Sequence, residues 1–233
     1  MIPKIIHYCW FGGNPLPESV TKFIASWRKF LPDYEIKEWN EDNFDLHCCK
    51  YVWEAYQAKK YAFVSDYARL YALYTEGGIY LDTDVEVRKS FNPLLENKSF
   101  VGWEDNFIGT GILASMKKQQ WVKDVLDTYA KESFISWSGK LNNLPNPYRL
   151  NKILHNYGLK NNHTYDVLQD DIAVYPIEIL CANNHEKNQY VITEDTVSIH
   201  HYSGTWNSKN KIGILKKLID RIKNVELKLS LLI

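Results

Sequence analysis

The sequence predicts an α/β fold, a Rossmann-like mixed sheet flanked by helices, and three observations support this. The chain opens with an apolar segment, an amphipathic segment and a second short apolar segment, which is a β-α-β order. A periodic helical segment over 61–76 then passes through a Gly-Gly pair into an apolar strand. Further strand and helix patterns follow as far as residue 206. With 233 residues, 45% of them hydrophobic, the chain can bury a substantial core.

The first three elements form the β-α-β unit. Residues 4–13, "KIIHYCWFGG", predict a buried strand that ends in a glycine turn. The helix after it begins at Glu18 or Ser19 and ends before Pro32. Its apolar stripe comprises Val20, Phe23, Ile24 and Trp27. Residues 34–40, "YEIKEWN", predict the second strand, and such a start is typical of a parallel, nucleotide-binding sheet.

The next helix is the clearest in the sequence. Its apolar residues recur at steps of three and four: Phe63, Tyr67, Leu70, Tyr71 and Tyr74. Gly77 and Gly78 supply the stop. Asp66 and Arg69 are three residues apart, so they share one helical face.

Two aspartates follow the strand "GIYL" at 78–81. Strand alternation places Asp82 and Asp84 on the same side, where their charges repel. Carboxylates at the carboxyl end of a strand suit a divalent cation such as Mn²⁺ or Mg²⁺, which would relieve that repulsion. A solvent-exposed acidic turn is the alternative, and the Asp-x-Asp pair alone does not decide between the two.

The rest of the chain completes one domain, expected over residues 1–207, with a basic helix at 208–233. Expected strands lie at 99–104, 109–116, 171–176 and 196–206, and expected helices lie within 119–133 and 144–158. The final segment carries seven basic and two acidic residues and is amphipathic. It predicts a helix that lies on an anionic membrane surface, or one that packs on the domain with a solvated basic side.

Several function classes are disfavoured. The chain shows no signal-peptide pattern and no stretch of about 20 apolar residues, so a cytoplasmic protein is expected. Cys9, Cys48, Cys49 and Cys181 have no CxxC spacing and are expected to be reduced thiols. No basic stripe with interleaved aromatic residues indicates nucleic-acid binding. His7, in the first strand, is expected to be a core histidine.

Three blocks together resemble glycosyltransferase family 32, whose sequences carry a DXD motif. They are "IPKIIHYCWFGG" at 2–13, "SDYARLYALYTEGGIYLDTDVEV" at 65–87 and "SIHHYSGTW" at 198–206. The family includes capsular polysaccharide sugar transferases, fungal initiating mannosyltransferases and, as relatives, the catalytic domains of large glucosylating toxins. The resemblance implies a GT-A fold and a metal-dependent, retaining transfer from a nucleotide sugar.

The resemblance also implies roles for individual residues. The metal would be held by Asp84, Asp82 and His200, with His201 as the alternative because strand alternation puts the two histidines on opposite faces. Asp82, Asp84 and Arg69 form the expected catalytic set. The expected donor-binding set is Cys9, Trp10, Ser65, Asp66, Arg69, Tyr80, Asp82, Thr83 and Trp206. Trp10 would stack on the base, and Trp206 would reach the leaving phosphate.

The implied function is transfer of a sugar, with a UDP-sugar favoured, to a lipid-linked oligosaccharide during capsular or other surface polysaccharide synthesis. The protein would then lie at the inner face of the membrane. A transferase acting on a protein side chain and a non-catalytic nucleotide-sugar-binding subunit are the alternatives. The loop residues Glu104, Asp105, Thr110 and Gly111 would contact the donor sugar or acceptor, or form a plain acidic surface loop. No nucleophile is assigned.

Overall fold

A computed structural model describes residues 1–203, and residues 1–202 form one compact unit with a central seven-stranded sheet. The strand order is β2-β1-β3-β6-β5-β8-β7. Their bounds are β1 Ile5–Cys9, β2 Glu35–Trp39, β3 Gly78–Leu81, β5 Ser99–Glu104, β6 Phe107–Ser115, β7 Asp166–Leu168 and β8 Ile172–Tyr175. β1 pairs in parallel with β2 and β3, whereas β6 runs antiparallel to β3 and β5. The expected mixed α/β sheet is confirmed.

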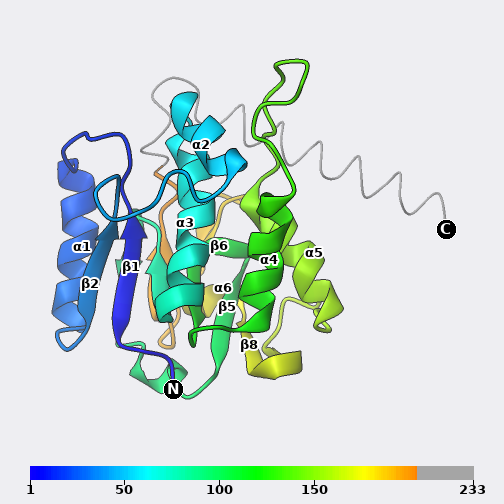
Figure 1. Ribbon diagram of the computed structural model, residues 1–233. Helices are drawn as coiled ribbons and strands as arrows, with labels where there is room; N and C mark the ends of the chain where they lie inside the picture. Colours follow the sequence, from blue (N-terminus) through cyan, green and yellow to red (C-terminus); the bar gives the residue numbers. More distant parts are fainter. Residues whose placement is uncertain (204–233) are drawn as a thin grey trace. The chain divides into compact units, whose positions relative to one another are not determined.

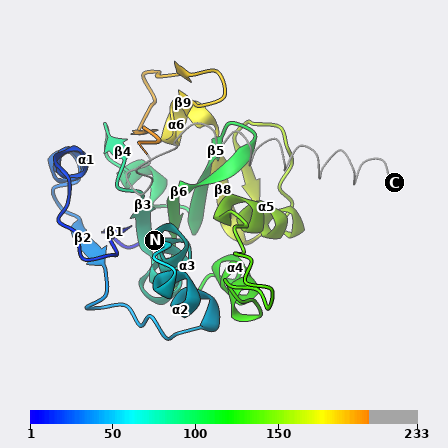
Figure 2. The ribbon, with the colours of Figure 1, turned by 90° about the horizontal axis from the view of Figure 1, so that it is seen from above.

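Helices cover both faces of this sheet (Figures 1 and 2). One face carries α2 Lys50–Gln57, α3 Tyr61–Glu76, α4 Gln120–Ala130 and α5 Asn146–Asn156; the other carries α1 Glu18–Phe30 and the short α6 Ile177–Leu180. β3 shows why two layers are needed. Tyr80 packs into the core under α3, and Ile79 and Leu81 pack into the core on the opposite side. A strand buried on both faces needs an apolar run, and "GIYL" is one.

A second, two-stranded sheet brings the end of the described chain to the turn after β3. It pairs β4 Val85–Val87 with β11 Ser198–His200, and Val85 lies opposite His200. A hairpin of β9 Asn183–Asn184 and β10 Gln189–Tyr190 lies nearby in sequence, and single 3₁₀ turns occupy Asn92–Leu94 and Gln169–Asp171. The β4–β11 pairing therefore joins two segments that are more than 110 residues apart.

The Gly77-Gly78 pair makes the reversal from α3 into β3 possible. Both residues have positive φ, +72° and +106°, which side-chain-bearing residues adopt at a cost. A Cβ on Gly78 would lie 2.6 Å from the carbonyl oxygen of Ile5. The pair thus ends the helix and lets β3 lie directly against β1.

Most expected elements form close to their expected bounds. The elements that the sequence does not predict are α2, α6, β4, β7, β9 and β10. Of the late strand expected over 196–206, the described part, 196–203, forms a strand at Ser198–His200. Trp206, the expected boundary at 207 and the basic helix at 208–233 lie outside the described residues. Within residues 1–203, no helix combines the length and apolarity that crossing a bilayer requires.

Two expectations about single residue types agree with the structure. The four cysteines are free thiols. His7 is fully buried; its Nε2 contacts the carbonyl of Gly77 at 2.7 Å, and its Nδ1 accepts the indole N–H of Trp39 at 3.1 Å. Burial lowers the pKa of His7, so it is a neutral core histidine.

Candidate active site

The Asp82-Thr83-Asp84 motif is a turn and not the end of a strand. β3 ends at Leu81, and the N–H of Val85 donates to the carbonyl of Asp82 at 3.0 Å. The N–H of Asp82 donates to the carbonyl of Gly111 on β6 at 2.8 Å, which anchors the turn to the sheet. The two carboxylates do converge, but through this turn geometry. Strand alternation ends with β3 at Leu81, so it does not apply to Asp82 and Asp84.

His200 joins the two aspartates because β11 pairs with the strand that follows them. Its Nε2 lies 3.2 Å from Asp84 Oδ1, and ligand atoms of Asp82, Asp84 and His200 lie within 4.8 Å of one another. His201 points elsewhere: its Nε2 meets Glu86 at 3.0 Å and its ring stacks on Phe23. The geometry therefore favours His200 over His201 as a metal ligand.

These residues fit a hard divalent cation. Two carboxylate oxygens and one imidazole nitrogen form a donor set that Mn²⁺ accepts. Gly111 leaves the space in which they meet: a Cβ there would lie 2.6 Å from His200 Cε1 and 3.2 Å from Asp82 Oδ2. Burial lowers the pKa of His200, but Glu104 and Asp84 outweigh burial and hold that pKa well above its ordinary value. A positive charge is thus favoured where the carboxylates converge.

Arg69, on α3, connects this helix to the DXD turn through its guanidinium. The residue is 5% exposed, and its guanidinium lies 3.3 Å from Asp82 Oδ1 and 3.1 Å from Asp66 Oδ1. It also donates to the carbonyl of Thr110 at 2.6 Å and, through Nε, to the carbonyl of Ser65 at 3.3 Å. Because these contacts occupy most of its donors, the structure favours a role in orienting Asp82. A direct contact between Arg69 and the donor, which the resemblance implies, does not fit this placement.

Tyr80 also acts through Asp82. Its hydroxyl donates to Asp82 Oδ1 at 2.8 Å, and its ring lies against Arg69. Only 1% of Tyr80 is exposed, so its ring does not line a nucleotide site as expected from the sequence. Cys9, on β1, is buried in the same way, and burial raises the pKa of its thiol to about 12.

The remaining expected donor residues lie around this network. Burial raises the pKa of Asp66 to about 6, although Arg69 offsets part of the effect. The hydroxyl of Ser65 donates to the carbonyl of Tyr61 within α3. Thr83 is partly exposed at the tip of the turn. Unlike Tyr80, these three side chains are not buried so deeply that they could not contact a bound donor.

A polar cavity of about 430 Å³ opens at the carboxyl ends of β1 and β2. Trp10 lines it, together with Gly12, Gly13, Asn14, Glu38, Asn40, Glu41, Asp42 and Tyr56. The indole N–H of Trp10 donates to the carbonyl of Asn14 at 2.6 Å, which fixes the ring plane. An oriented, partly exposed indole beside polar groups suits a flat heterocycle.

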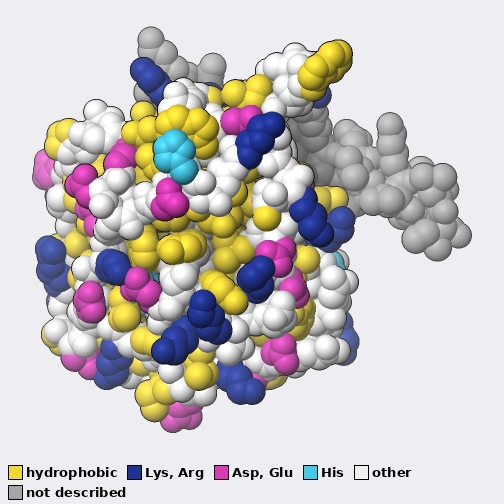
Figure 3. All heavy atoms as spheres, viewed as in Figure 1, with side chains coloured by type: hydrophobic (Ala, Val, Ile, Leu, Met, Phe, Trp, Pro, Cys, Tyr) yellow, Lys and Arg dark blue, Asp and Glu magenta, His cyan; other side chains and the backbone are white. Residues whose placement is uncertain are grey.

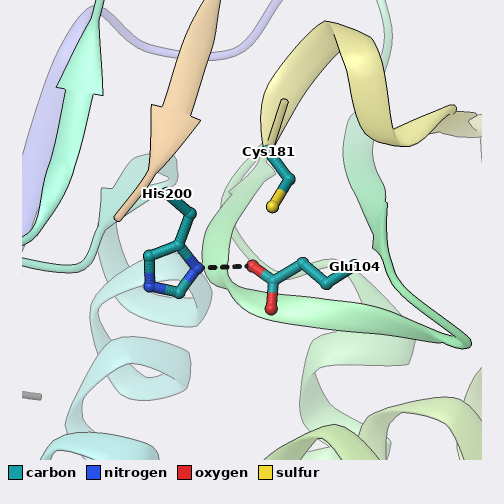
Figure 4. Close-up of side chains that lie close together, drawn as sticks. All are labelled: Glu104, Cys181 and His200. Atoms are coloured by element: carbon teal, nitrogen blue, oxygen red, sulfur yellow. Dashed lines mark hydrogen bonds and ion pairs between the residues drawn. The ribbon is translucent and has the colours of Figure 1, made fainter. Parts of the chain in front are cut away.

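Glu104 is the site residue that sequence reasoning misplaced. The sequence places it with Asp105, Thr110 and Gly111 in a loop that would contact the donor sugar or acceptor, or form a plain acidic surface loop. The structure places it at the end of β5, where its Oε1 contacts Nδ1 of His200 at 2.8 Å (Figure 4). The glycines at 109 and 111 were the available signal, since small residues at alternate positions mark a strand face that other groups approach closely.

Comparisons with known proteins show what the sequence is similar to. Residues 17–101 match the family model described as a glycosyltransferase sugar-binding region containing a DXD motif. Inositol phosphoceramide mannosyltransferase 3 of Schizosaccharomyces pombe is 35% identical over 104 residues, which are 43% of this chain and 29% of that protein. An uncharacterized glycosyltransferase, L373, of Acanthamoeba polyphaga mimivirus is 27% identical, over 72% of this chain and 60% of that protein.

The fold is shared with a solved glycosyltransferase. The PaToxG glycosyltransferase superposes with a TM-score of 0.50 and 20% identity over 66% of this chain and 68% of that one. The chain spans about a third of the length of the first curated relatives that it matches. Residues 17–101 therefore match a DXD-containing glycosyltransferase region, and the superposition shows that the described chain has the GT-A fold.

Proposed function

We propose that this protein is a metal-dependent, retaining glycosyltransferase that moves a sugar from a nucleoside diphosphate sugar to an acceptor hydroxyl. The observation that carries the proposal is the convergence of Asp82, Asp84 and His200 at the carboxyl end of β3. This is where open α/β sheets bind their ligands. The cavity beside Trp10 lies at the same edge of the sheet, at the ends of β1 and β2.

Each part of the site has a role in this proposal. Asp82, Asp84 and His200 would hold Mn²⁺ or Mg²⁺. When bound, the cation would supply positive charge for the diphosphate that leaves. The Trp10 indole would stack on the base, and Arg69 with Tyr80 would hold Asp82 in its ligating position. The DXD turn is then rigid before the donor arrives, which reduces the reorganisation that the reaction needs.

The donor and acceptor follow from similarity. The resemblance to family 32 favours a UDP-sugar, whereas the name of one relative specifies mannose, so GDP-mannose belongs in the same test. That relative is named for inositol phosphoceramide, a lipid, which supports a lipid-linked saccharide as acceptor. Synthesis of a capsular or other surface polysaccharide on the cytoplasmic side of a membrane would supply such an acceptor.

Peripheral membrane contact through residues 208–233 is part of the proposal and has its own test. The segment carries seven basic and two acidic residues, so its attraction to anionic lipid should weaken with salt. The full chain should co-sediment with phosphatidylserine vesicles at low salt, and a variant lacking 211–233 should not. Equal binding by both forms would refute the contact.

The deciding experiment is donor hydrolysis across a panel of UDP- and GDP-sugars, with Mn²⁺ and then with EDTA. We expect release of one nucleotide that requires the metal and is lost in Asp84→Asn. Some transferases are silent without acceptor, so the melting temperature with each donor and Mn²⁺ is measured in parallel. If no donor is hydrolysed and none raises the melting temperature, the transferase proposal is wrong.

A further inference from the structure

The two nitrogens of His200 face two different acids. Nε2 points toward the DXD turn, 3.2 Å from Asp84 Oδ1. Nδ1 lies 2.8 Å from Glu104 Oε1 (Figure 4). His200 is 7% exposed, and the Glu104 side chain is 16% exposed. A carboxylate can only accept, so each nitrogen carries a proton in these contacts; a bound cation would replace the proton on Nε2, whereas Nδ1 would keep its own.

Strand β6 has two glycines where the side chains of His200 and Glu104 approach it. Gly109 and Gly111 lie two residues apart on β6, so they face the same side. A Cβ on Gly109 would lie 2.0 Å from Cδ of Glu104, and one on Gly111 would lie 2.6 Å from Cε1 of His200. Any side chain at either position would displace the carboxylate or the imidazole. The register of β5 against β6 also shifts between Val101 and Trp103, just before Glu104.

From this geometry we infer that Glu104 is a positioning residue, which holds the His200 ring so that Nε2 is presented to the metal beside Asp82 and Asp84. The inference rests on the proposed metal-dependent function and extends it by one residue. Carboxylates that accept the second N–H of a ligating histidine fix its tautomer and ring orientation, and their loss typically weakens metal binding by 10–100-fold. Glu104 would not touch the donor or the acceptor, in contrast to the expectation from the sequence.

A competing arrangement uses the same neighbourhood. Ligand atoms of Glu104, Cys181 and His200 also lie within 4.8 Å of one another, so Glu104 could ligate a metal together with the thiol. The contacts disfavour it. Sγ of Cys181 lies 3.2 Å from the Tyr202 hydroxyl and 3.5 Å from the carbonyl of Asn183, and Nδ1 of His200 is already held by Glu104. Cys181 is therefore a neighbour of the pair, and it serves as the control.

The test measures Mn²⁺ affinity directly. The full chain is stripped with EDTA, and free Mn²⁺ is titrated by electron paramagnetic resonance, with and without UDP. Four variants are compared with wild type: Glu104→Ala, Glu104→Gln, Glu104→Asp and the control Cys181→Ser. Circular dichroism confirms that each variant is folded.

A positioning role predicts a specific order of affinities. Glu104→Ala should weaken Mn²⁺ binding by about 10–100-fold. Glu104→Gln keeps the reach and an accepting oxygen, so it should recover most of the affinity. Glu104→Asp keeps the charge but is one methylene too short, so it should resemble Glu104→Ala. Cys181→Ser should bind as wild type does.

Other outcomes overturn the inference, and each points to a different cause. Wild-type affinity in folded Glu104→Ala would show that Glu104 does not position His200. Recovery by Glu104→Asp and not by Glu104→Gln would show that its charge acts instead. A loss in Cys181→Ser equal to that in Glu104→Ala would favour the thiol-containing metal site. If wild type itself binds no Mn²⁺ under either condition, the metal site and the proposed function fail together. If Glu104→Ala does not fold, the order of the glutamine and aspartate variants decides.

Discussion

Replacing Gly111 with alanine tests the packing of the metal site by adding a single methyl group. The new Cβ would lie 2.6 Å from Cε1 and 2.8 Å from Nδ1 of His200, whereas ordinary contacts begin at 3.4 Å. The imidazole must therefore shift by roughly 0.8 Å, or the backbone of β6 must move. Overpacking of this kind typically costs about 1–3 kcal/mol.

This free energy can appear either as weaker metal binding or as lower stability of the folded protein. If His200 swings aside in the metal-free protein, the strain returns when the ring moves back to ligate. Mn²⁺ binding should then weaken by about 5- to 150-fold, with little change in melting temperature. If the ring is held in place, the strain destabilises the folded protein instead, and the melting temperature falls. The two effects should together account for the expected 1–3 kcal/mol.

Gly102→Ala is a matched control on the neighbouring strand β5. Its Cβ would meet the Leu180 side chain at 3.0 Å, in the apolar core. We expect it to lower the melting temperature without changing Mn²⁺ affinity. Calorimetric titration with Mn²⁺ and thermal unfolding of both variants complete the comparison. If Gly111→Ala matches wild type in both measurements, the close approach of His200 to β6 is wrong.

Three further predictions concern the rest of the site. Trp10→Ala should weaken UDP or GDP binding by about 1–3 kcal/mol in calorimetry while leaving Mn²⁺ affinity unchanged; equal nucleotide affinity would remove the indole from the base site. Arg69→Leu should destabilise the protein by about 3–5 kcal/mol in urea unfolding, because it leaves the nearby carboxylates of Asp66 and Asp82 without their cation. A loss of stability smaller than that caused by a substitution at an exposed position would contradict the network. The pKa of Asp66, about 6 when folded, lies above its ordinary 3.8, so its contribution to stability is present at low pH and lost as pH rises through 6. Asp66→Asn should therefore gain stability relative to wild type between about pH 4 and 7, by up to about 3 kcal/mol; a constant difference across that range would refute the assignment.

These predictions separate two layers of the site. Asp82, Asp84 and His200 are the groups proposed to meet the cation. Arg69, Tyr80 and Glu104 lie behind them and set their positions through contacts of 2.8–3.3 Å. Substitutions in the first layer should abolish metal binding, whereas those in the second should weaken it by degrees. Gly111 belongs to neither layer, but it provides the space in which the first one assembles.

The local elements around the site were predictable from the sequence because their determinants are local. The three- and four-residue steps of Tyr67, Leu70, Tyr71 and Tyr74 define α3, and Gly77 can only end it. The apolar run at 79–81 defines β3. These patterns lie within a few residues of the structure that they specify, so a single sequence contains them. The DXD residues stand out in the sequence for the same reason, whereas their turn geometry does not.

Only the tertiary structure decided which side chains meet. His200 reaches Asp84 because β11 pairs with β4, and Glu104 reaches His200 because two glycines on β6 let it approach. Tyr80 was expected to line the donor site, yet β3 is buried on both faces and the Tyr80 ring has no route to solvent. Arg69 was expected among the donor-binding residues, yet its donors are taken by the carbonyl of Thr110 and two carboxylates. The sequence by itself determined the elements and the chemical types at the site, because those depend on neighbours along the chain. The roles of Tyr80, Arg69 and Glu104 depend on strand pairing and burial across about 100 residues, which no local pattern encodes.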